Sequence, residues 1–232
     1  MLCVVFDLDD TLYLERDYVR SGFAAAGAWA EREWCVQDFA ERAWREFQSG
    51  RRGDIFNHVL AACGLCTGEA VAELLRVYRS HLPRISLLPD SVTCLAALRP
   101  HARLAVISDG PLEAQQKKVL ALGLDTAVEM MVLTGLWGQE FWKPHPRAFE
   151  YVQQQIGVAP GCCVYIGDNP AKDFVAPRRL GWHTIRVRRL GGLHFEREAP
   201  AGCSAEYEVH DLRGAASLVL NHIDKNAASL TI

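Results

Sequence analysis

Several carboxylates in this sequence fall where they could act together on one ligand. Asp7, Asp9 and Asp10 follow an apolar run near the start of the chain, in the stretch VVFDLDDTLY, and Asp168 and Asp173 follow another apolar run much later. Carboxylates that converge without a partner repel one another, and desolvating them costs several kcal/mol. A divalent cation removes that cost. Aspartates, a backbone carbonyl and waters are the hard oxygen ligands that Mg²⁺ prefers.

A lysine, a hydroxyl and helix N-termini near the same strand ends would add a phosphate site to this cation. Lys143 lies in the loop after one predicted strand, and Ser108-Asp109-Gly110 ends another. Pro111, Pro146 and Pro170 are placed as first-turn prolines, which predicts three helices that begin near the strand ends. Such helices present free amide groups and a positive dipole end to an anion. The sequence therefore predicts that a phosphoryl group binds here.

Short apolar segments that alternate with helical stretches must position these side chains. This spacing is typical of βαβ crossovers in a parallel sheet. At least five strands are predicted, over Leu2–Phe6, Arg103–Ile107, Glu129–Leu133, Cys162–Ile166 and His183–Val187. The predicted fold class is therefore α/β, with a doubly wound parallel sheet. In such a sheet, ligands bind beyond the carboxyl ends of the strands, where the strand order reverses.

Residues 13–83 follow a different pattern and are predicted to form an inserted all-helical cap subdomain. Apolar residues recur at helical spacing from Val36 to Phe47 and from Val71 to Tyr78. Asp54 and Thr67 stand where helix N-caps are expected. The predicted core of this subdomain includes three tryptophans, Trp29, Trp34 and Trp44. The expected domains are thus an α/β catalytic core of residues 1–12 and 84–232, and a helical cap of residues 13–83.

Composition excludes several classes of partner. The chain has 232 residues, a formal net charge of −3 and no run of Lys or Arg, so neither a nucleic acid nor an anionic membrane is expected to bind. No apolar run approaches the ~20 residues of a membrane span. Eight cysteines without a secretory leader favour reduced thiols. We therefore expect a cytoplasmic protein, a monomer or homodimer, whose partner is a small molecule.

The motifs together resemble those of the haloacid dehalogenase-like (HAD) hydrolases, in particular the phosphatase branch with a helical cap after the first strand. Asp7-Leu8-Asp9-Asp10-Thr11 resembles the D-x-D-x-T motif of that family, Ser108 its second motif, Lys143 its third, and Asp168 with Asp173 its fourth. All four occur in the family's order, and the resemblance covers residues 2 to about 190. It implies a Rossmann-like core and the catalytic residues described next.

The resemblance implies a Mg²⁺-dependent phosphomonoesterase that acts through an aspartyl-phosphate. Asp7 would attack phosphorus, because a carboxylate is already ionised at neutral pH. Asp9 would protonate the leaving oxygen and then deprotonate water, and Lys143 would supply positive charge. The implied metal ligands are Asp7, the Asp9 carbonyl and Asp168, with Asp173 orienting Lys143 or the waters of the metal. The implied phosphate contacts are Thr11, Ser108, Asp109 and Gly110.

Other functions stay open at this point. A sugar phosphomutase of the same fold would use the same residues and differ in how the cap excludes water. A phospho-receiver module or a non-catalytic phosphate-binding protein would belong to a different class. A dehalogenase is disfavoured, because it would not need an acid two residues after the nucleophile. Substrate choice is expected from the cap, where Arg16, Arg51 and Arg52 are candidate contacts to the small phosphate ester.

Overall fold

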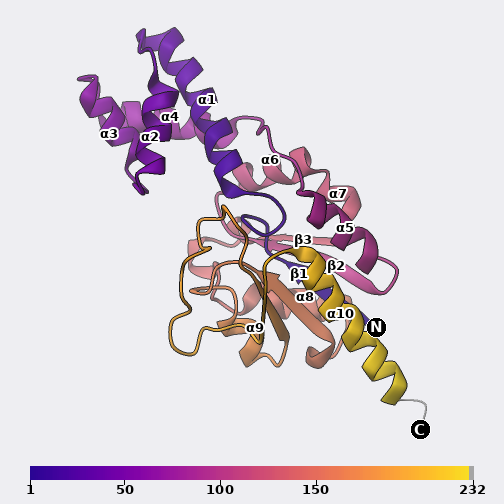
Figure 1. Ribbon diagram of the computed structural model, residues 1–232. Coiled ribbons are helices and arrows are strands. Elements are labelled where there is room, and N and C mark those ends of the chain that lie inside the picture. Colours follow the sequence, from indigo (N-terminus) through magenta and orange to yellow (C-terminus); the bar gives the residue numbers. More distant parts are fainter. Residues whose placement is uncertain (230–232) are drawn as a thin grey trace. The chain divides into compact units, whose positions relative to one another are not determined.

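The computed structural model describes residues 1–229, with side chains described up to residue 221 (Figure 1). The chain forms two compact units, a core unit of Met1–Glu15 with the chain from Ser86 onward, and a helical unit of Arg16–Ile85. The boundaries thus lie at residues 15/16 and 85/86, where the sequence predicted 12/13 and 83/84. Tyr13 belongs to the core unit because its side chain is fully buried there and its hydroxyl donates to Asp9.

Six parallel strands form the sheet of the core unit, in the order β3-β2-β1-β4-β5-β6. The strands are β1 (Leu2–Phe6), β2 (Ala102–Ser108), β3 (Met130–Leu133), β4 (Cys163–Gly167), β5 (His183–Val187) and β6 (Tyr207–Val209). The predicted doubly wound α/β fold is confirmed, and the first five strands match the predicted ones to within one residue at each end. The short strand β6 was not predicted, because its sequence Tyr-Glu-Val is mostly exposed and shows no strand pattern.

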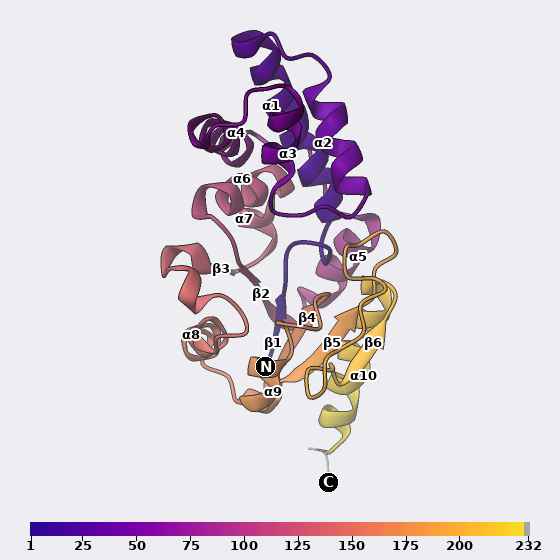
Figure 2. The same ribbon diagram turned by 90° about the vertical axis from the view of Figure 1, so that its left-hand side faces the viewer.

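Helices cover both faces of this sheet (Figure 2). Alternate residues of a strand point to opposite faces, so Cys3 and Val5 of β1 join one buried cluster with Phe149 of α8 (Arg147–Ile156). The opposite face is covered by α5 (Pro89–Leu98) and α10 (Leu212–Ser229), which contact each other. Cover on both faces explains why the strands are continuous apolar runs.

The core unit contains further elements between its strands. They are α6 (Leu112–Leu122), α7 (Leu124–Ala127), α9 (Val175–Arg179) and the 3₁₀ turns Thr134–Leu136, Gln139–Phe141 and Pro160–Cys162. Pro111 and Pro146 directly precede α6 and α8, close to the predicted positions. Pro170 begins no helix, since the chain turns after it and α9 starts only at Val175. The prediction that Pro170 is the first-turn proline of a helix is therefore wrong.

The helical unit contains α1 (Glu15–Trp34) apart from its first residue, α2 (Phe39–Gln48), α3 (Ile55–Ala62) and α4 (Gly68–Ser80). Its centre is built from phenylalanines, with Phe23 contacting Phe47 and Phe56 at ring-centroid distances of 6.3 and 5.8 Å. Trp29 and Trp34 are only half-buried and pack edge-to-face on each other. Trp44 is half-buried as well, so the prediction of a tryptophan core is wrong.

The two predicted N-caps of this unit behave differently. The Thr67 hydroxyl accepts a hydrogen bond from the Ala70 amide at 3.1 Å and caps α4. Asp54 precedes α3 but makes no side-chain cap, because its carboxylate accepts a hydrogen bond from Arg51 at 3.0 Å. Across the described residues of both units, no helix combines the length and the apolar character that crossing a membrane requires.

Candidate active site

The carboxyl ends of β1 and β4 meet at the middle of the sheet, where the strand order reverses. Asp7 follows β1 directly, and its amide donates to the carbonyl of Ile166 in β4 at 2.8 Å. Asp168 follows β4 directly. Parallel pairing in register therefore carries both carboxylates to the same edge. An open parallel sheet binds its ligands at this kind of crevice.

Asp7, Asp168 and Asp173 form an acidic cluster, in which each carboxylate places an oxygen atom within 4.8 Å of the others. All three residues are buried. Burial raises the pKa of Asp7 to about 7, with Asp173 adding to the rise and Lys143 opposing it. Burial also raises the pKa of Asp168 well above its usual range, and Asp173 and Asp7 add to it. Because these carboxylates resist ionisation together, a divalent cation fits the cluster.

A buried lysine lies against this acidic cluster. The Lys143 Nζ is 2.8 Å from Asp173 Oδ1 and donates to the Asp7 carboxylate and, at 2.8 Å, to the Tyr165 hydroxyl. Burial alone would lower the pKa of this ammonium group, but Asp173 and Asp7 raise it well above its usual range. Lys143 is therefore charged and offsets part of the negative charge. Tyr165 was not predicted, since a tyrosine inside a buried strand resembles an ordinary core residue.

Asp173 is held at both of its carboxylate oxygens. Oδ2 accepts a hydrogen bond from the Asn169 amide at 2.9 Å, and Oδ1 lies 2.8 Å from the Lys143 Nζ. The residue is fully buried in the loop after β4. Of the two roles expected for Asp173, this geometry supports the orientation of Lys143, and a contact to metal-bound water stays a prediction.

The end of β2 brings a hydroxyl to the same edge of the sheet. Ser108 is the last residue of β2 and is buried, and its hydroxyl donates to Gln115 Oε1 of α6 at 2.8 Å. Gly110 has a φ of +136°, and a Cβ at this position would lie 2.5 Å from Gln115 Nε2. The positive φ favours glycine here, and any larger residue would also require the Gln115 side chain to move. The turn from Ser108 to Gly110 thus joins β2 to α6 in a fixed geometry.

Asp109 holds the segment that carries Lys143. Its carboxylate accepts hydrogen bonds from the Thr134 hydroxyl at 2.9 Å and the Lys143 amide at 3.2 Å, and pairs with Lys172 at 3.1 Å. Burial favours the protonated form, but Lys143 and Lys172 hold the pKa of Asp109 below its usual range. Hydrogen-bond donors already surround this carboxylate. We therefore expect that Asp109 contacts the phosphate through its backbone amide.

Asp9 is placed apart from the acidic cluster. Its carboxylate accepts a hydrogen bond from the Tyr13 hydroxyl and two from the Lys118 Nζ, at 2.7 and 2.9 Å. The side chain of Asp9 is 21% exposed, and that of Lys118 in α6 is 4% exposed. The expected metal contact of Asp9 concerns its backbone carbonyl and stays a prediction. Lys118 was not predicted, although a lysine within the buried stripe of α6 is an unusual signal.

Asp10 stabilises the turn between β1 and α1. It has a positive φ of 52°, and its carboxylate accepts hydrogen bonds from the amides of Glu15 at 2.8 Å and Leu193 at 2.7 Å. Burial raises the pKa of Asp10 to about 6, and these amides oppose the rise. These contacts hold the turn, and Asp10 lies outside the acidic cluster of Asp7, Asp168 and Asp173.

The backbone of Thr11 is held by a buried ion pair. Arg189 donates to the Thr11 carbonyl at 2.7 Å and forms a salt bridge with Asp90 at 3.0 Å. The hydroxyl of Thr11 is buried and has no hydrogen-bond partner within the described part of the chain. Buried hydroxyls are normally hydrogen-bonded, so the Thr11 hydroxyl is available to bond a ligand. The expected phosphate contact of Thr11 stays a prediction.

The three arginines expected to contact the substrate all have partners inside the helical unit. Arg51 forms ion pairs with two carboxylates of that unit, at 2.8 and 3.0 Å. Arg52 lies 3.9 Å from the ring centroid of Phe47 and donates to the Phe47 carbonyl. The Arg16 guanidinium lies 5.9 Å from the ring of Trp44. These contacts stabilise the unit itself, and a role in specificity stays a prediction.

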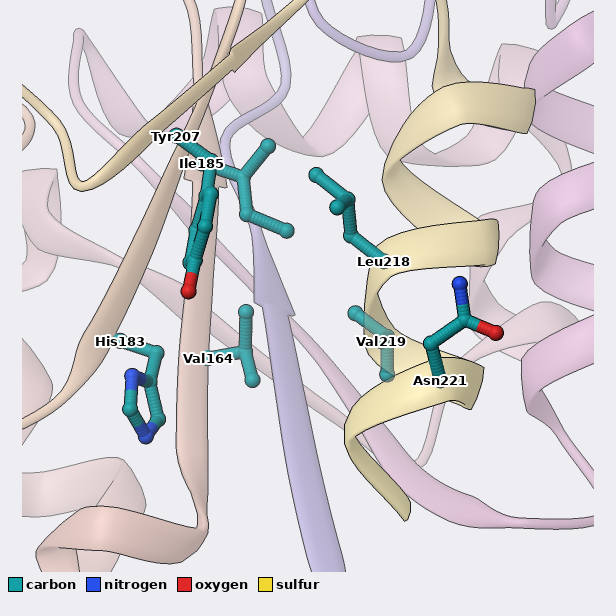
Figure 3. Close-up of a pocket in the computed structure, with 7 residues that line it drawn as sticks. All are labelled: Val164, His183, Ile185, Tyr207, Leu218, Val219 and Asn221. Atoms are coloured by element: carbon teal, nitrogen blue, oxygen red, sulfur yellow. The ribbon is translucent and has the colours of Figure 1, made fainter. Parts of the chain in front are cut away.

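A pocket of about 200 Å³ lies between strands β4 to β6 and α10 (Figure 3). Its lining residues are Val164, His183, Ile185, Tyr207, Leu218, Val219 and Asn221. None of these residues belongs to the acidic cluster or to its hydrogen-bond partners, and most are apolar. We therefore place the chemistry at the strand ends and not in this pocket.

Known proteins resemble this chain in both sequence and structure. A family model described as haloacid dehalogenase-like hydrolase matches residues 1–181. The (S)-2-haloacid dehalogenase of Xanthobacter autotrophicus is 26% identical over 87% of this chain and 81% of its own length. The phosphoserine phosphatase of Thermus thermophilus is 29% identical over 84% of this chain and 69% of its own length.

A solved structure shows the same fold. It is the crystal structure of the putative HAD-hydrolase YfnB from Bacillus subtilis bound to magnesium, with a TM-score of 0.68 and 17% identity. The match covers 94% of this chain and 98% of that one. The relatives thus include both dehalogenases and phosphatases, and the side chains of the site must separate the two reactions.

Proposed function

This chain belongs to the haloacid dehalogenase-like hydrolase family, and from that premise we propose that it is a Mg²⁺-dependent phosphomonoesterase acting on a small soluble phosphate ester. The observation that carries this proposal is the carboxylate of Asp9, two residues after the nucleophile candidate Asp7. An alkoxide leaving group needs a proton, whereas a halide leaves without one. A carboxylate in this position therefore has a task in ester hydrolysis and none in dehalogenation.

Asp7 is the proposed nucleophile. It follows the central strand directly, and its amide is fixed by the hydrogen bond to β4. Lys143 donates to its carboxylate and opposes the effect of burial on its pKa, so Lys143 favours the ionised form that attacks phosphorus. As the bond from Asp7 to phosphorus forms, the ester P–O bond breaks, and the leaving oxygen takes the proton that Asp9 supplies, which leaves an aspartyl-phosphate. Asp9 then takes a proton from the water that hydrolyses this intermediate.

The residues of the acidic cluster fit a magnesium ion. Asp7 and Asp168 would hold it through carboxylate oxygens, together with the Asp9 carbonyl. When bound, the ion supplies positive charge that draws the anionic nucleophile and the anionic phosphate together. Lys143 contributes fixed charge beside the transferred group, and the Ser108 hydroxyl with the amides of the β2–α6 turn completes the phosphate contacts.

A phosphomutase of the same fold stays the alternative in the same class of chemistry. It would differ in how water is excluded from the aspartyl-phosphate, so release of inorganic phosphate from sugar phosphates separates the two. A purely phosphate-binding module or a phospho-receiver is disfavoured, because this chain carries all four proposed catalytic and metal-binding residues, Asp7, Asp9, Lys143 and Asp168. The small-molecule partner, the cytoplasmic location and the monomeric or homodimeric state stay predictions.

A phosphatase screen tests the proposed function. The panel should contain sugar phosphates, nucleotides, glycolate phosphate and phosphorylated acids, each assayed with Mg²⁺ and with EDTA. We expect at least one ester to release phosphate in the Mg²⁺ samples alone. Equal release with and without Mg²⁺ would contradict the proposed metal dependence, and no release from any ester would contradict the proposed reaction.

Magnesium should change how the stability of the protein depends on pH. The pKa of Asp7 is raised by burial to about 7, so between pH 4 and 7 the folded state holds more protons than the unfolded state. Stability without metal should therefore fall as pH rises through this window. A bound cation favours the ionised carboxylates and should remove most of that loss. Urea unfolding at pH 5, 6, 7 and 8, with EDTA or with Mg²⁺, measures both effects.

The matched control for this experiment is Asp168→Asn. It retains Asp7 and Lys143 but removes one ligand, and it should lose the Mg²⁺ effect. Asp109, whose pKa is held low by Lys143 and Lys172 against the effect of burial, contributes a loss of stability only at more acidic pH. If Mg²⁺ stabilised the wild-type protein equally at pH 5 and pH 8, the cluster would not be the metal site.

Asp9→Asn should slow turnover of an alkyl phosphate by about 100-fold to 10,000-fold, the range for loss of a general acid or base. Magnesium binding should persist, because the Asp9 carboxylate contacts Tyr13 and Lys118 and lies outside the cluster. The measurements are phosphate release and the Mg²⁺-induced shift in the thermal midpoint. A loss of Mg²⁺ affinity as large as that of Asp168→Asn would show that the division of roles is wrong.

A further inference from the structure

The mechanism above gives no task to Lys118, a buried charge of the core unit. Lys118 is 4% exposed in its side chain, and its Nζ contacts both carboxylate oxygens of Asp9 at 2.7 and 2.9 Å. It lies on the buried face of α6 with Ala114, Val119 and Leu122. A charge at such a position is costly unless it is well paired. An apolar residue would suit that face of the helix, whereas Lys118 pairs with Asp9 at hydrogen-bond distance and also interacts electrostatically with the nearby Glu15.

The contacts around Asp9 restrict its side chain from two sides. Lys118 contacts both oxygens, and the hydroxyl of Tyr13 donates to Oδ1. Tyr13 is itself fully buried, and an isolated backbone bridge pairs its segment with that of Asp9. A short aspartate side chain held by these donors has little freedom to rotate, even though it is 21% exposed.

The same helix also fixes the phosphate-binding hydroxyl. Gln115 lies three residues before Lys118, on the same side of α6, and accepts the hydrogen bond of Ser108 at 2.8 Å. Gln115 and Lys118 are both buried. One face of α6 therefore contacts two groups that the proposed reaction uses, namely the hydroxyl at the end of β2 and the carboxylate after β1.

From these contacts we infer that Lys118 is the positioning residue of Asp9, which it holds in the orientation that delivers a proton to the leaving oxygen. This inference rests on the proposed phosphomonoesterase function. Proton transfer requires hydrogen-bond distance to the leaving oxygen, and a misplacement of about 1 Å can cost about 100-fold in rate. Lys118 itself touches neither the phosphoryl group nor the nucleophile in this account, and it transfers no proton.

A comparison of leaving groups tests the inference. The value of kcat/KM reports the reaction up to transfer of the phosphoryl group, which needs the acid for an alkoxide but hardly for 4-nitrophenolate. Lys118→Met should lower kcat/KM for an alkyl phosphate such as glycerol phosphate by about 100-fold. It should lower kcat/KM for 4-nitrophenyl phosphate by less than about threefold. Lys118→Arg, which keeps the charge, should recover part of the alkyl activity.

Two further variants separate positioning from a general structural effect. Lys117→Met removes the neighbouring lysine of α6, which is not fully buried, and should leave both substrates unaffected. In the Asp9→Asn background, Lys118→Met should have no additional effect on the alkyl phosphate, because the two residues act as one unit. The Mg²⁺-induced shift of the thermal midpoint should be retained in every folded variant.

The outcomes distinguish the inference from the function on which it rests. A wild-type enzyme that hydrolyses both esters, together with a Lys118→Met variant that loses both to the same extent or loses neither, overturns the inference alone. An additive effect of Lys118→Met in the Asp9→Asn background also overturns it. If Lys118→Met does not fold, the same selectivity should be measured in Lys118→Arg and Tyr13→Phe, and unchanged ratios for both overturn it. A wild-type enzyme inactive on every ester overturns the proposed function, and the inference with it.

Discussion

An Asp7→Asn variant is expected to release phosphate at least about a thousandfold more slowly than the wild-type enzyme, the scale of losing an essential catalytic group. The amide is nearly isosteric with the carboxylate but cannot form the aspartyl-phosphate. The fold should persist, because the amide of Asp7 still donates to the Ile166 carbonyl. Phosphate release and thermal unfolding of the same preparation measure the two properties.

Asp10→Asn is the matched control for this variant. Asp10 is a buried aspartate of the same loop, but its carboxylate accepts hydrogen bonds from two backbone amides and lies outside the acidic cluster. We expect this change to cost less than about tenfold in activity and some stability, since an amide oxygen replaces only one of the two acceptors. Residual activity of Asp7→Asn above about one part in a thousand would exclude Asp7 as the nucleophile.

Lys143→Met should have the second-largest effect, on both activity and stability. Lys143 is the buried cation against Asp7 and Asp173, and removing one partner of a buried ion pair typically costs about 3–5 kcal/mol. The loss of stability should be smaller at low pH. Lys143 lowers the pKa of Asp7 against the effect of burial, so in the variant without Lys143 the Asp7 carboxylate takes up a proton more easily. A protonated Asp7 cannot attack, so activity at neutral pH should fall by at least about 100-fold.

Tyr165→Phe provides the comparison for Lys143→Met. It removes one hydrogen-bond partner of the ammonium group, at 2.8 Å, but leaves the charge in place. Its activity should therefore stay within about tenfold of wild type. Kinetics at pH 6 and pH 8 and urea unfolding at the same two values measure the predicted differences. If a folded Lys143→Met variant kept nearly full activity, Lys143 would have only a structural role.

The fold followed from patterns that depend on local sequence. Buried parallel strands are continuous apolar runs, and the helical segments between them have a clear period, so five strands were placed to within one residue. Patterns failed where packing decides the outcome. The tryptophans of the helical unit are half-buried because phenylalanines fill its centre, and Asp54 pairs with Arg51 in place of capping α3.

The sequence motifs predicted only part of the candidate site. Asp7 and Asp168 were singled out because both follow predicted strands, and together with Lys143 they resemble the motifs of one family. Lys118 escaped notice because it meets Asp9 across 109 residues of sequence, and no local pattern reveals such a distance. The available signal was a charged residue on a buried face of the helix. The role of that residue can be interpreted only when its partner Asp9 is known.

The most direct test of the account is a parallel assay of phosphate and halide release by one preparation of the enzyme, since its relatives include a phosphoserine phosphatase and a (S)-2-haloacid dehalogenase. Wild-type and Asp9→Asn proteins should each be given the best ester of the phosphatase screen and, separately, (S)-2-chloropropionate, with Mg²⁺ or EDTA. The account predicts Mg²⁺-dependent phosphate release that Asp9→Asn loses, and no chloride release. Chloride release that persists in EDTA and in Asp9→Asn, without phosphate release from any ester, would contradict it.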